Sequence, residues 1–294
     1  MRHAVIVAGT MMLSAACAPD GVLGDDVASQ QGDGGSQGPD ADVGGGPCDM
    51  TGVWIAEQHT VSTALATPQN TTNWFYYRIT QTGDRFTVVD QLNCGFVVDG
   101  TTTVTLDDAT LEALAPAEFA AKRTGTFALT GDGAHCDFTL DRGYNVRGAD
   151  MATYLTDVWQ PGDPPIALDQ LPALPSAPPG MEDWDDDGQD GITLRSGLGN
   201  RYVCQRDYNE HRGTTPTYAA AFGGDGVITV LWDSQEGISN QTPPLLRTSA
   251  TPDGDGWARY ARVGDRLQVV TTGDHPALET CRNVQVLAQE VWPG

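Results

Sequence analysis

The stretch Asn73-Trp-Phe-Tyr-Tyr-Arg-Ile-Thr80 decides the fold class of this chain. Its residues alternate with a period of two, which is the side-chain period of a β-strand. One face of the predicted strand is apolar: Phe75, Tyr77 and Ile79. The other face is aromatic and polar: Trp74, Tyr76 and Arg78. The alternation therefore predicts a strand with one face in a core.

The same period recurs on both sides of this stretch. Gly52-Val-Trp-Ile-Ala-Glu-Gln-His-Thr-Val61 is predicted as the preceding strand, with Val53, Ile55 and Val61 on one face. Further short strands are predicted at Phe86–Val89, Thr101–Leu106, Thr124–Leu129, Cys136–Leu140, Gly191–Arg195, Arg201–Glu210, Gly226–Trp232, Trp257–Val263 and Arg266–Val270. Many short strands joined by tight turns are typical of an antiparallel barrel or sandwich. We therefore expect an all-β fold.

Two kinds of segment interrupt the predicted strands. Asp107 and Asp108 can cap one short helix, which Pro116 then breaks or kinks, and Ala277–Val284 has a second helical pattern. Residues 161–180 are rich in proline, which cannot donate to a sheet, so they predict a connecting loop. We expect one β domain over 48–294, with two halves, 48–160 and 181–294, as the alternative division.

The N-terminal residues have the pattern of an export signal. Arg2 precedes an apolar run from Ala4 to Leu13, and small residues stand directly before Cys17. The run is shorter than the ~20 residues that span a membrane, but it suits a secretory signal. We expect residues 1–16 to be a signal peptide. Residues 17–47 are rich in Gly and Asp and predict a disordered tether.

Ser14-Ala-Ala-Cys17 resembles a bacterial lipoprotein signal, which implies acylation of Cys17. The family usually has leucine three residues before the cysteine, whereas this chain has Ser14 there and Leu13 before it. Ordinary signal cleavage is the alternative. Ala18, where inner-membrane retention would have Asp, implies an outer-membrane location. The resemblance therefore implies a cell-envelope protein whose membrane partner is reached through a lipid anchor.

The charge of the chain limits its partners. Asp and Glu total 39 against 16 Lys and Arg, which gives a net charge of −23. Such a charge repels nucleic-acid phosphates and anionic lipid head groups. We therefore expect no nucleic-acid partner.

The cysteines predict disulfides, because an exported chain reaches an oxidising compartment. The pairs expected are Cys94–Cys136 and Cys204–Cys281, each within one half of the chain, with Cys48 left near the tether. Their wide spacing matches no zinc signature, since there is no Cys-x-x-Cys and no nearby pair of histidines.

Gly52-Val53-Trp54 resembles the Gly-x-Trp signature of lipocalins and similar up-and-down barrels. The resemblance implies that Trp54 closes the barrel against an arginine from a late strand, for which the candidates are Arg262, Arg266 and Arg282. The C-terminal part, from Asp183-Trp-Asp-Asp-Asp-Gly188 to Glu279-Thr-Cys281, is similar to uncharacterised secreted lipoproteins of myxobacterial type. That similarity implies a class and a location but no activity.

The acidic stretch Glu182-Asp-Trp-Asp-Asp-Asp-Gly-Gln-Asp190 is a candidate calcium loop. Alternate carboxylates followed by glycine match the start of an EF-type loop, but its twelfth position is Leu194, where a bidentate Glu is needed. The candidate ligands are Asp183, Asp185, Asp187, the Gln189 carbonyl and Asp190. A hydrated turn that leads into the next strand is the alternative.

The sequence has no recognisable catalytic motif. Glu57 and His59 share one strand face and Asp207 and His211 another, but neither pair has a nucleophile in context. Trp74, Tyr76 and Arg78 are instead candidates to line a ligand cup in a wide barrel, with ordinary sheet packing as the alternative.

These features predict a non-catalytic cell-envelope lipoprotein that binds a small apolar ligand or a surface partner. A structural or adhesive lipoprotein stabilised by calcium is the first alternative, and a hydrolase without a recognisable motif is the second. No cofactor other than calcium is expected.

Overall fold

The computed structural model describes residues 46–64, 67–99, 103–117, 123–150, 174, 180–197, 199–224, 226–238 and 251–293. The predicted signal peptide, Cys17 and nearly all of the predicted tether lie outside the described residues. So does most of the proline-rich segment, of which only 174 and 180 are described.

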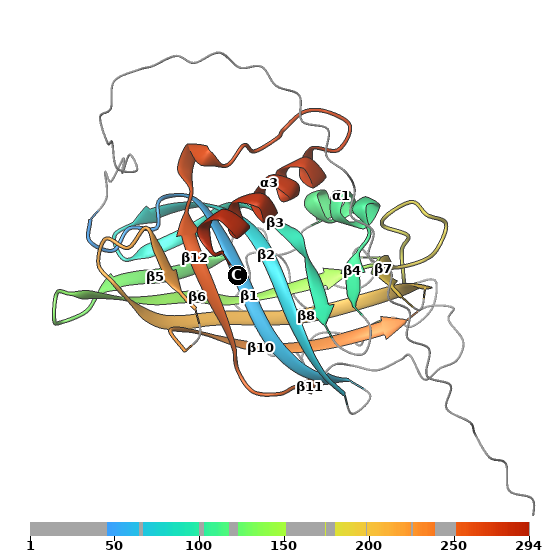
Figure 1. Cartoon of the computed structure of the whole chain (residues 1–294), viewed down its shortest axis with the longest axis horizontal. Coiled ribbons are helices and arrows are strands. Elements are labelled where there is room, and N and C mark those ends of the chain that lie inside the picture. The colour runs from blue at the N-terminus through green and yellow to red at the C-terminus, as the bar shows by residue number, and fades with distance from the viewer. Residues whose placement is uncertain are drawn as a thin grey trace, which may run out of the picture. The chain divides into compact units, whose positions relative to one another are not determined.

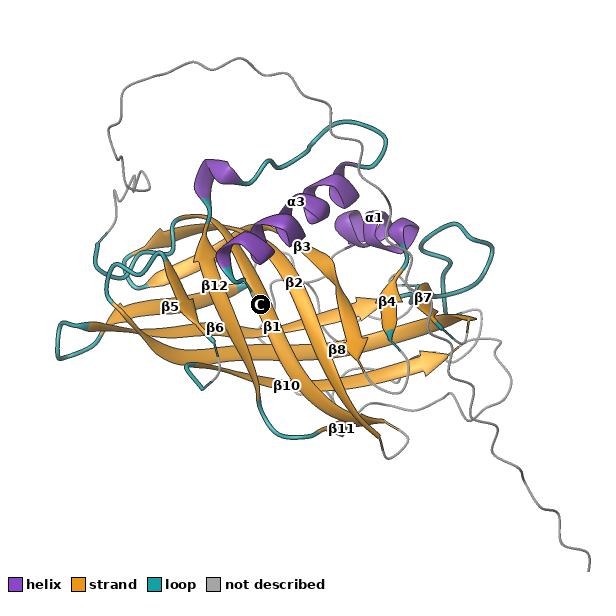
Figure 2. Ribbon diagram, viewed as in Figure 1, coloured by secondary structure: helices purple, strands orange, loops and turns teal. Residues whose placement is uncertain are grey.

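Strands make up most of the described chain. They are β1 Gly52–Ala64, β2 Thr67–Thr82, β3 Arg85–Asp99, β4 Val104–Leu106, β5 Thr124–Leu129, β6 His135–Arg147, β7 Ile192–Ser196, β8 Gly199–Pro216, β9 Ala221–Gly223, β10 Ile228–Ile238, β11 Thr251–Pro252 and β12 Gly256–Arg262. The helices are α1 Asp108–Ala117, the short 3-10 helix η3 Gly264–Arg266 and α3 Pro276–Val291. Figure 2 shows the strands as one curved wall with the helices on its outer side.

The strands form one antiparallel sheet that closes into a ring (Figure 1). Its order is β10-β12-β1-β2-β3-β4-β7-β8, and β8 pairs back to β10. Between β3 and β8 the wall divides, because the start of β3 pairs with β5 and its end pairs with β4. β6 joins β5 to β8 on this second route. The all-β antiparallel prediction is confirmed, although the divided wall differs from a simple up-and-down barrel.

One end of the ring is filled by an apolar core rich in aromatic rings. Its inward side chains come from β1, β2, β3, β5, β6, β9, β10 and β12. Phe138 and Phe222 pack edge to face with centroids 5.3 Å apart, and Phe222 stacks on Tyr260 at 5.2 Å. Such offset and edge-to-face pairs add stability beyond the buried area. The core at this end therefore consists largely of aromatic rings in mutual contact.

Trp54 lies in this apolar core and contacts an arginine of the last strand. Its side chain is fully buried, and its indole N–H donates to the Met50 carbonyl at 2.8 Å. The guanidinium carbon of Arg262 lies 5.0 Å from the Trp54 ring centroid, as in a cation–π contact. Of the three arginines considered from the sequence, Arg262 is the one in contact with Trp54.

Helix α3 covers the outer face of the sheet. It lies across β1, β2 and β3 in Figure 1. Pro276 begins the helix, and Cys281, Val284 and Leu287 follow at helical spacing along its buried stripe. They pack with outward side chains of the sheet such as Ile55 and Tyr76. The predicted helix at Ala277–Val284 is therefore confirmed, and it extends about two turns further, to Val291.

The disulfides differ from the predicted pairs. Cys48 bonds to Cys136, Cys94 bonds to Cys281, and Cys204 is free and buried. The predicted Cys94–Cys136 pair is wrong because Cys136 lies in the core inside the ring, whereas Cys94 lies outside it under α3. The predicted Cys204–Cys281 pair is wrong because α3 brings Cys281 onto β3 rather than onto β8, which contains Cys204.

The predicted strand at Arg266–Val270 is also wrong. Arg266 ends the 3-10 helix, and residues 267–270 form no strand. Leu267 is buried in the cluster under α3, which explains its apolar character without a strand. The backbone of Val270 bonds to the Thr280 hydroxyl, with the N–H donating at 2.8 Å and the carbonyl accepting at 3.3 Å. A side chain of α3 thus takes the place of a neighbouring strand.

Candidate functional site

A polar cavity occupies the other end of the ring. Its volume is about 130 Å³, and it lies near the strand ends at Ala64 and Asp99. Strands β1, β2, β3, β4, β6, β7, β8 and β10 all contribute to its wall. Amide and hydroxyl groups dominate the lining, among them Gln58, Thr60, Thr71, Asn73, Asn93 and Asn209. The barrel interior is therefore apolar at one end and polar at the other.

The inward side chains change from apolar to polar along single strands. β1 places Trp54 and Ala56 in the apolar core. The next residues of the same parity, Gln58, Thr60 and Ser62, line the cavity. Because successive side chains of a strand point to opposite faces, these five residues all face inward. β2 makes the same change in the opposite chain direction, so the two strands build the cavity wall together.

Three polar atoms on uncharged side chains of this wall have no hydrogen-bond partner among the described residues. They are the Gln58 side-chain oxygen, the Asn209 side-chain oxygen and the Trp232 indole N–H. Gln58 is 5% exposed and Asn209 is 4% exposed. A buried polar atom without a partner costs about 1–3 kcal/mol. The uncharged side chains of the wall therefore offer two acceptors and one donor to a bound molecule.

The charged groups in the wall are compensated. Arg147 donates to Asp207 at 2.8 Å and to the Gln205 side-chain oxygen at 3.2 Å. The Asn145 amide donates to the other Asp207 oxygen at 2.7 Å. Arg201 also has an interaction partner. The wall consequently presents no unpaired charge for an ionic ligand.

His211 lies between the cavity wall and the apolar core. It is fully buried, and its Nδ1 is hydrogen-bonded to the Tyr260 hydroxyl. Burial, with the nearby charge of Arg123 as a second cause, holds the pKa of His211 well below its usual 6.5. Burial likewise raises the pKa of Tyr260 well above its usual 10.0. His211 is therefore neutral in the folded protein at pH 7.

This neutral histidine should make the fold sensitive to acid. Below pH 6.5 the unfolded chain binds a proton on His211 and the folded chain does not, so the unfolded state gains protons as the pH falls. Stability should fall by up to about 1.4 kcal/mol per pH unit from this group alone. Urea unfolding of wild type and His211→Gln between pH 7.5 and 5 measures the slope. Equal slopes in the two proteins would contradict the assignment.

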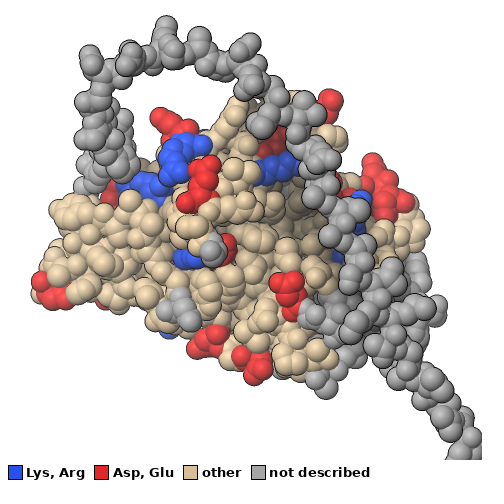
Figure 3. Space-filling model, viewed as in Figure 1, with Lys and Arg blue, Asp and Glu red and all other residues tan. Residues whose placement is uncertain are grey.

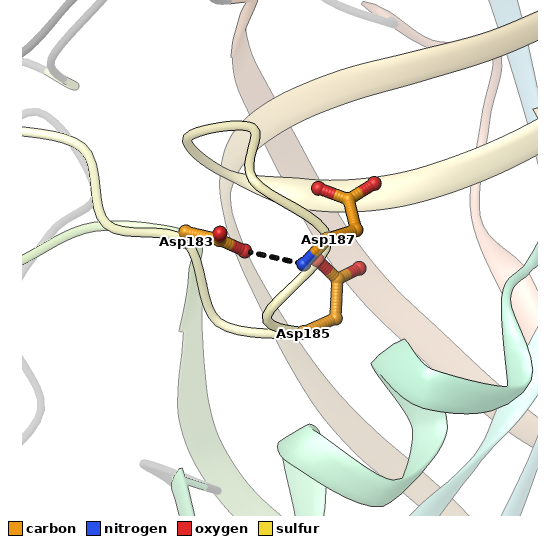
Figure 4. A group of neighbouring side chains, drawn as sticks. All are labelled: Asp183, Asp185 and Asp187. Atoms are coloured by element: carbon orange, nitrogen blue, oxygen red, sulfur yellow. Dashed lines mark hydrogen bonds between the residues drawn. The ribbon is translucent and has the colours of Figure 1, made fainter.

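The acidic loop lies beside helix α1, away from the aromatic core. One oxygen from each of Asp183, Asp185 and Asp187 lies within 4.8 Å of the others (Figure 4). Asp190 is not part of this group. The Gln189 N–H donates to Asp187 at 2.9 Å, so Gln189 contacts the group through its backbone nitrogen. The loop also makes the predicted turn into β7, because Gly191 N–H donates to the Glu182 carbonyl at 2.8 Å.

Trp74, Tyr76 and Arg78 face away from the interior of the ring. Trp74 lines a groove of about 360 Å³ on the outer side, between α3 and the sheet. Tyr76 is buried under α3, and its hydroxyl donates to Asp90 at 3.1 Å. Arg78 is exposed. The expected ligand face is therefore not the lining of the cavity, because the Phe75 side of β2 faces inward.

Of the two acid–histidine pairs that share a strand face in the sequence, one is hydrogen-bonded in the structure and the other is not. Glu57 and His59 are hydrogen-bonded at 2.5 Å on the outer face, where Glu57 also accepts from Trp74 and Arg259. Burial alone would raise the pKa of Glu57, but the His59 hydrogen bond and the Arg259 charge hold it below its usual value. A carboxylate with three donors is suited to fastening strands together. His211 binds Tyr260, and Asp207 binds Arg147, so they do not form a pair.

No protein-family model, curated protein or solved structure matches this chain. Within the described ranges, no helix has both the length and the apolar character to cross a membrane. The candidate function therefore rests on the geometry of the cavity.

The residues of the cavity were not anticipated from the sequence, although one signal pointed to them. If Trp54 faces the barrel interior, then Gln58 and Thr60 share its parity and face the interior too. Asn209 and Trp232 had no comparable signal. Their facing position depends on how β8 and β10 pair, with Asn209 directly opposite Trp232.

Proposed function

We propose that this chain is a binding protein that holds a small, uncharged, polyhydroxylated molecule, such as a single sugar ring, in the polar half of its barrel. The observation that carries the proposal is the set of buried, unpartnered atoms on Gln58, Asn209 and Trp232 around one cavity. A hydroxyl group both donates and accepts. It can therefore satisfy the two oxygens and the indole N–H, which no acyl chain can do.

The other features of the lining support the same class of ligand. Phe75 and Trp232 add flat apolar surface to the polar wall, and binding sites commonly combine such surface with a few placed polar groups. The volume of about 130 Å³ is below the range of roughly 300–1,000 Å³ that holds drug-sized ligands. Because Arg147 and Arg201 already have partners, an anionic ligand finds no free cation among the described lining residues. These points favour a small neutral molecule over the apolar ligand expected from the sequence.

A surface partner is less well supported than an interior ligand. On the face drawn in Figure 3, acidic side chains are spread over several elements and do not gather into one patch. We also propose that the protein is exported and lipid-anchored at Cys17; the two disulfides among the described residues suit export to an oxidising compartment. Catalysis is not part of the proposal.

A matched pair of glutamine variants tests the ligand class. Gln58→Met keeps the side-chain volume but removes the unpartnered oxygen, whereas Gln268→Met makes the same change at an exposed position. Without ligand, Gln58→Met should be about 1–2 kcal/mol more stable than wild type, because a buried unsatisfied acceptor is gone. It should also bind sugars at least tenfold more weakly. Urea unfolding and calorimetry with glucose, galactose, N-acetylglucosamine and inositol measure both effects.

Two results would overturn the proposal. One is tight binding of dodecanoic acid or a naphthalene dye inside the barrel with no binding of the sugars. The other is a Gln58→Met protein that is no more stable than wild type, which would mean that the Gln58 oxygen is already satisfied. Native mass spectrometry of the full chain, recovered from the membrane fraction of the cells that make it, would show a retained hexose-sized ligand and the acyl chain together.

A further inference from the structure

Backbone hydrogen bonds hold the acidic loop in one turn conformation. Asp183 forms a bridge with Gly191 across the base of the loop, and Trp184 N–H donates to the Gly191 carbonyl at 3.2 Å. Within the loop, the Asp183 carboxylate accepts from the backbone N–H of Asp187 at 3.2 Å and of Gly188 at 2.8 Å. These backbone hydrogen bonds therefore determine the positions of the three carboxylates.

The oxygens of this group already have the spacing of ligands around one ion. One oxygen each from Asp183, Asp185 and Asp187 lies within 4.8 Å of the other two. Ca²⁺ takes oxygen ligands at about 2.4 Å, so two oxygens on opposite sides of one ion are about 4.8 Å apart. Figure 4 shows the Asp183 carboxylate directed across the loop and the Asp185 carboxylate lying beneath the backbone nitrogen of Asp187.

A second observation comes from the burial of Asp185. This residue is only 9% exposed, and its Oδ1 has no hydrogen-bond donor among the described residues. Its Oδ2 accepts from the Thr193 N–H at 2.9 Å and from the Thr110 hydroxyl. No arginine or lysine of the described ranges pairs with Asp183, Asp185 or Asp187. A buried carboxylate oxygen with neither donor nor counter-charge is costly, and a bound cation removes that cost.

We propose that Asp183, Asp185 and Asp187 bind one Ca²⁺ ion. Calcium is favoured over magnesium because it accepts six to eight oxygens in irregular geometry, whereas Mg²⁺ demands a near-ideal octahedron at about 2.1 Å. Carbonyl groups of the loop and water complete the shell. The position that supplies a bidentate Glu in an EF-type loop is Leu194, which lines the cavity instead. The affinity should therefore be in the weak range of extracellular modules, with a Kd of about 10⁻⁴–10⁻³ M.

The ion would link three parts of the fold, namely the acidic loop, α1 and β7. Asp185 is hydrogen-bonded to Thr110 of α1 and to Thr193 of β7. Thr193 also donates through its hydroxyl to Asp187 at 3.0 Å. β7 in turn pairs with β4, and together they form one branch of the divided wall. Calcium should consequently stabilise this branch, whether or not a ligand occupies the barrel.

Terbium luminescence on the full chain tests the site directly, because Trp184 lies inside the loop and can transfer its excitation to a bound Tb³⁺ ion. Wild type should give sensitised emission that millimolar Ca²⁺ displaces and equal Mg²⁺ does not. Ca²⁺ at 100 times its Kd should also raise the Tm by about 5 °C or more. Asp185→Asn should lose at least tenfold in Ca²⁺ affinity.

Asp186→Asn is the matched control. It removes the same charge from the same loop, but Asp186 is exposed, is not in the cluster and has a φ of 57°, which asparagine tolerates well. It should keep the emission and the Tm shift. Equal losses in Asp186→Asn and Asp185→Asn would mean diffuse charge attraction and would overturn the site. So would a wild-type Tm that does not respond to Ca²⁺, a result that needs no variant to fold.

Discussion

Replacing Cys94 and Cys281 together by alanine should lower the free energy of unfolding by about 5 kcal/mol. The disulfide joins residues 187 positions apart. In the chain-entropy model a loop of that length restricts the unfolded chain by about 5 kcal/mol. Domains of this kind are stable by only about 5–15 kcal/mol, so the variant should be close to unfolding at 37 °C. Urea unfolding followed by circular dichroism measures the loss.

The matched control is Cys204→Ala, which removes a buried thiol that forms no disulfide. Burial raises the pKa of Cys204 to about 12, so this thiol should stay unreactive until the protein unfolds. Its loss should cost far less than loss of the Cys94–Cys281 bond. If Cys204→Ala were the more damaging change, the disulfide assignment would be wrong. Peptide mapping without reduction gives a direct check of Cys48–Cys136 and Cys94–Cys281.

Trp54→Ala should cost about 3–5 kcal/mol, the usual range for removing a buried tryptophan. The side chain is fully buried in the apolar core. Its removal leaves a cavity beside Phe222, whose ring centroid lies 5.6 Å away, and it leaves the Met50 carbonyl without its 2.8 Å donor. The substitution also removes the aromatic ring that the Arg262 guanidinium contacts. The free energy of urea unfolding is the measurement.

Trp54→Phe and Arg262→Met separate these contributions. Trp54→Phe keeps an aromatic ring but loses the indole N–H, so it should cost about 1–2 kcal/mol. Arg262→Met keeps much of the stem and loses the charge above the ring. A double-mutant cycle between the two sites should give a coupling of about 0.5–2 kcal/mol. A coupling near zero would show that Arg262 only covers Trp54 without stabilising it.

The strands were predictable because alternation is a local property. Thr124–Leu129 was predicted with its observed bounds, and the stretch around Phe75 and Tyr77 was placed in the right kind of element. Which side of that strand faces inward was not decided by alternation, since both sides are aromatic. The position of α3 decides it, because that helix covers the Tyr76 side and makes an apolar outer face favourable.

The disulfides and the cavity could not be predicted in the same way. Cys94 and Cys281 meet only because the last helix folds back onto β3. The spacing of the cysteines in the sequence does not indicate this long-range packing. Asn209 and Trp232 face one another through the pairing of β8 with β10, which is a long-range property. The acidic loop was the exception. Its carboxylates are neighbours in sequence, so the proximity of Asp183, Asp185 and Asp187 follows from the sequence, although Asp190 lies outside the group.

The Cys48–Cys136 bond would have a mechanical consequence if the chain were anchored at its N-terminus, as we propose. Cys48 precedes β1, and Cys136 lies in β6. A pull on the chain ahead of Cys48 therefore passes through the sulfur bridge into β6. It does not peel β1 away from its neighbours β2 and β12. Because β1 supplies both Trp54 and the Gln58 side of the cavity, the bridge shields the apolar core and the polar cavity from tension.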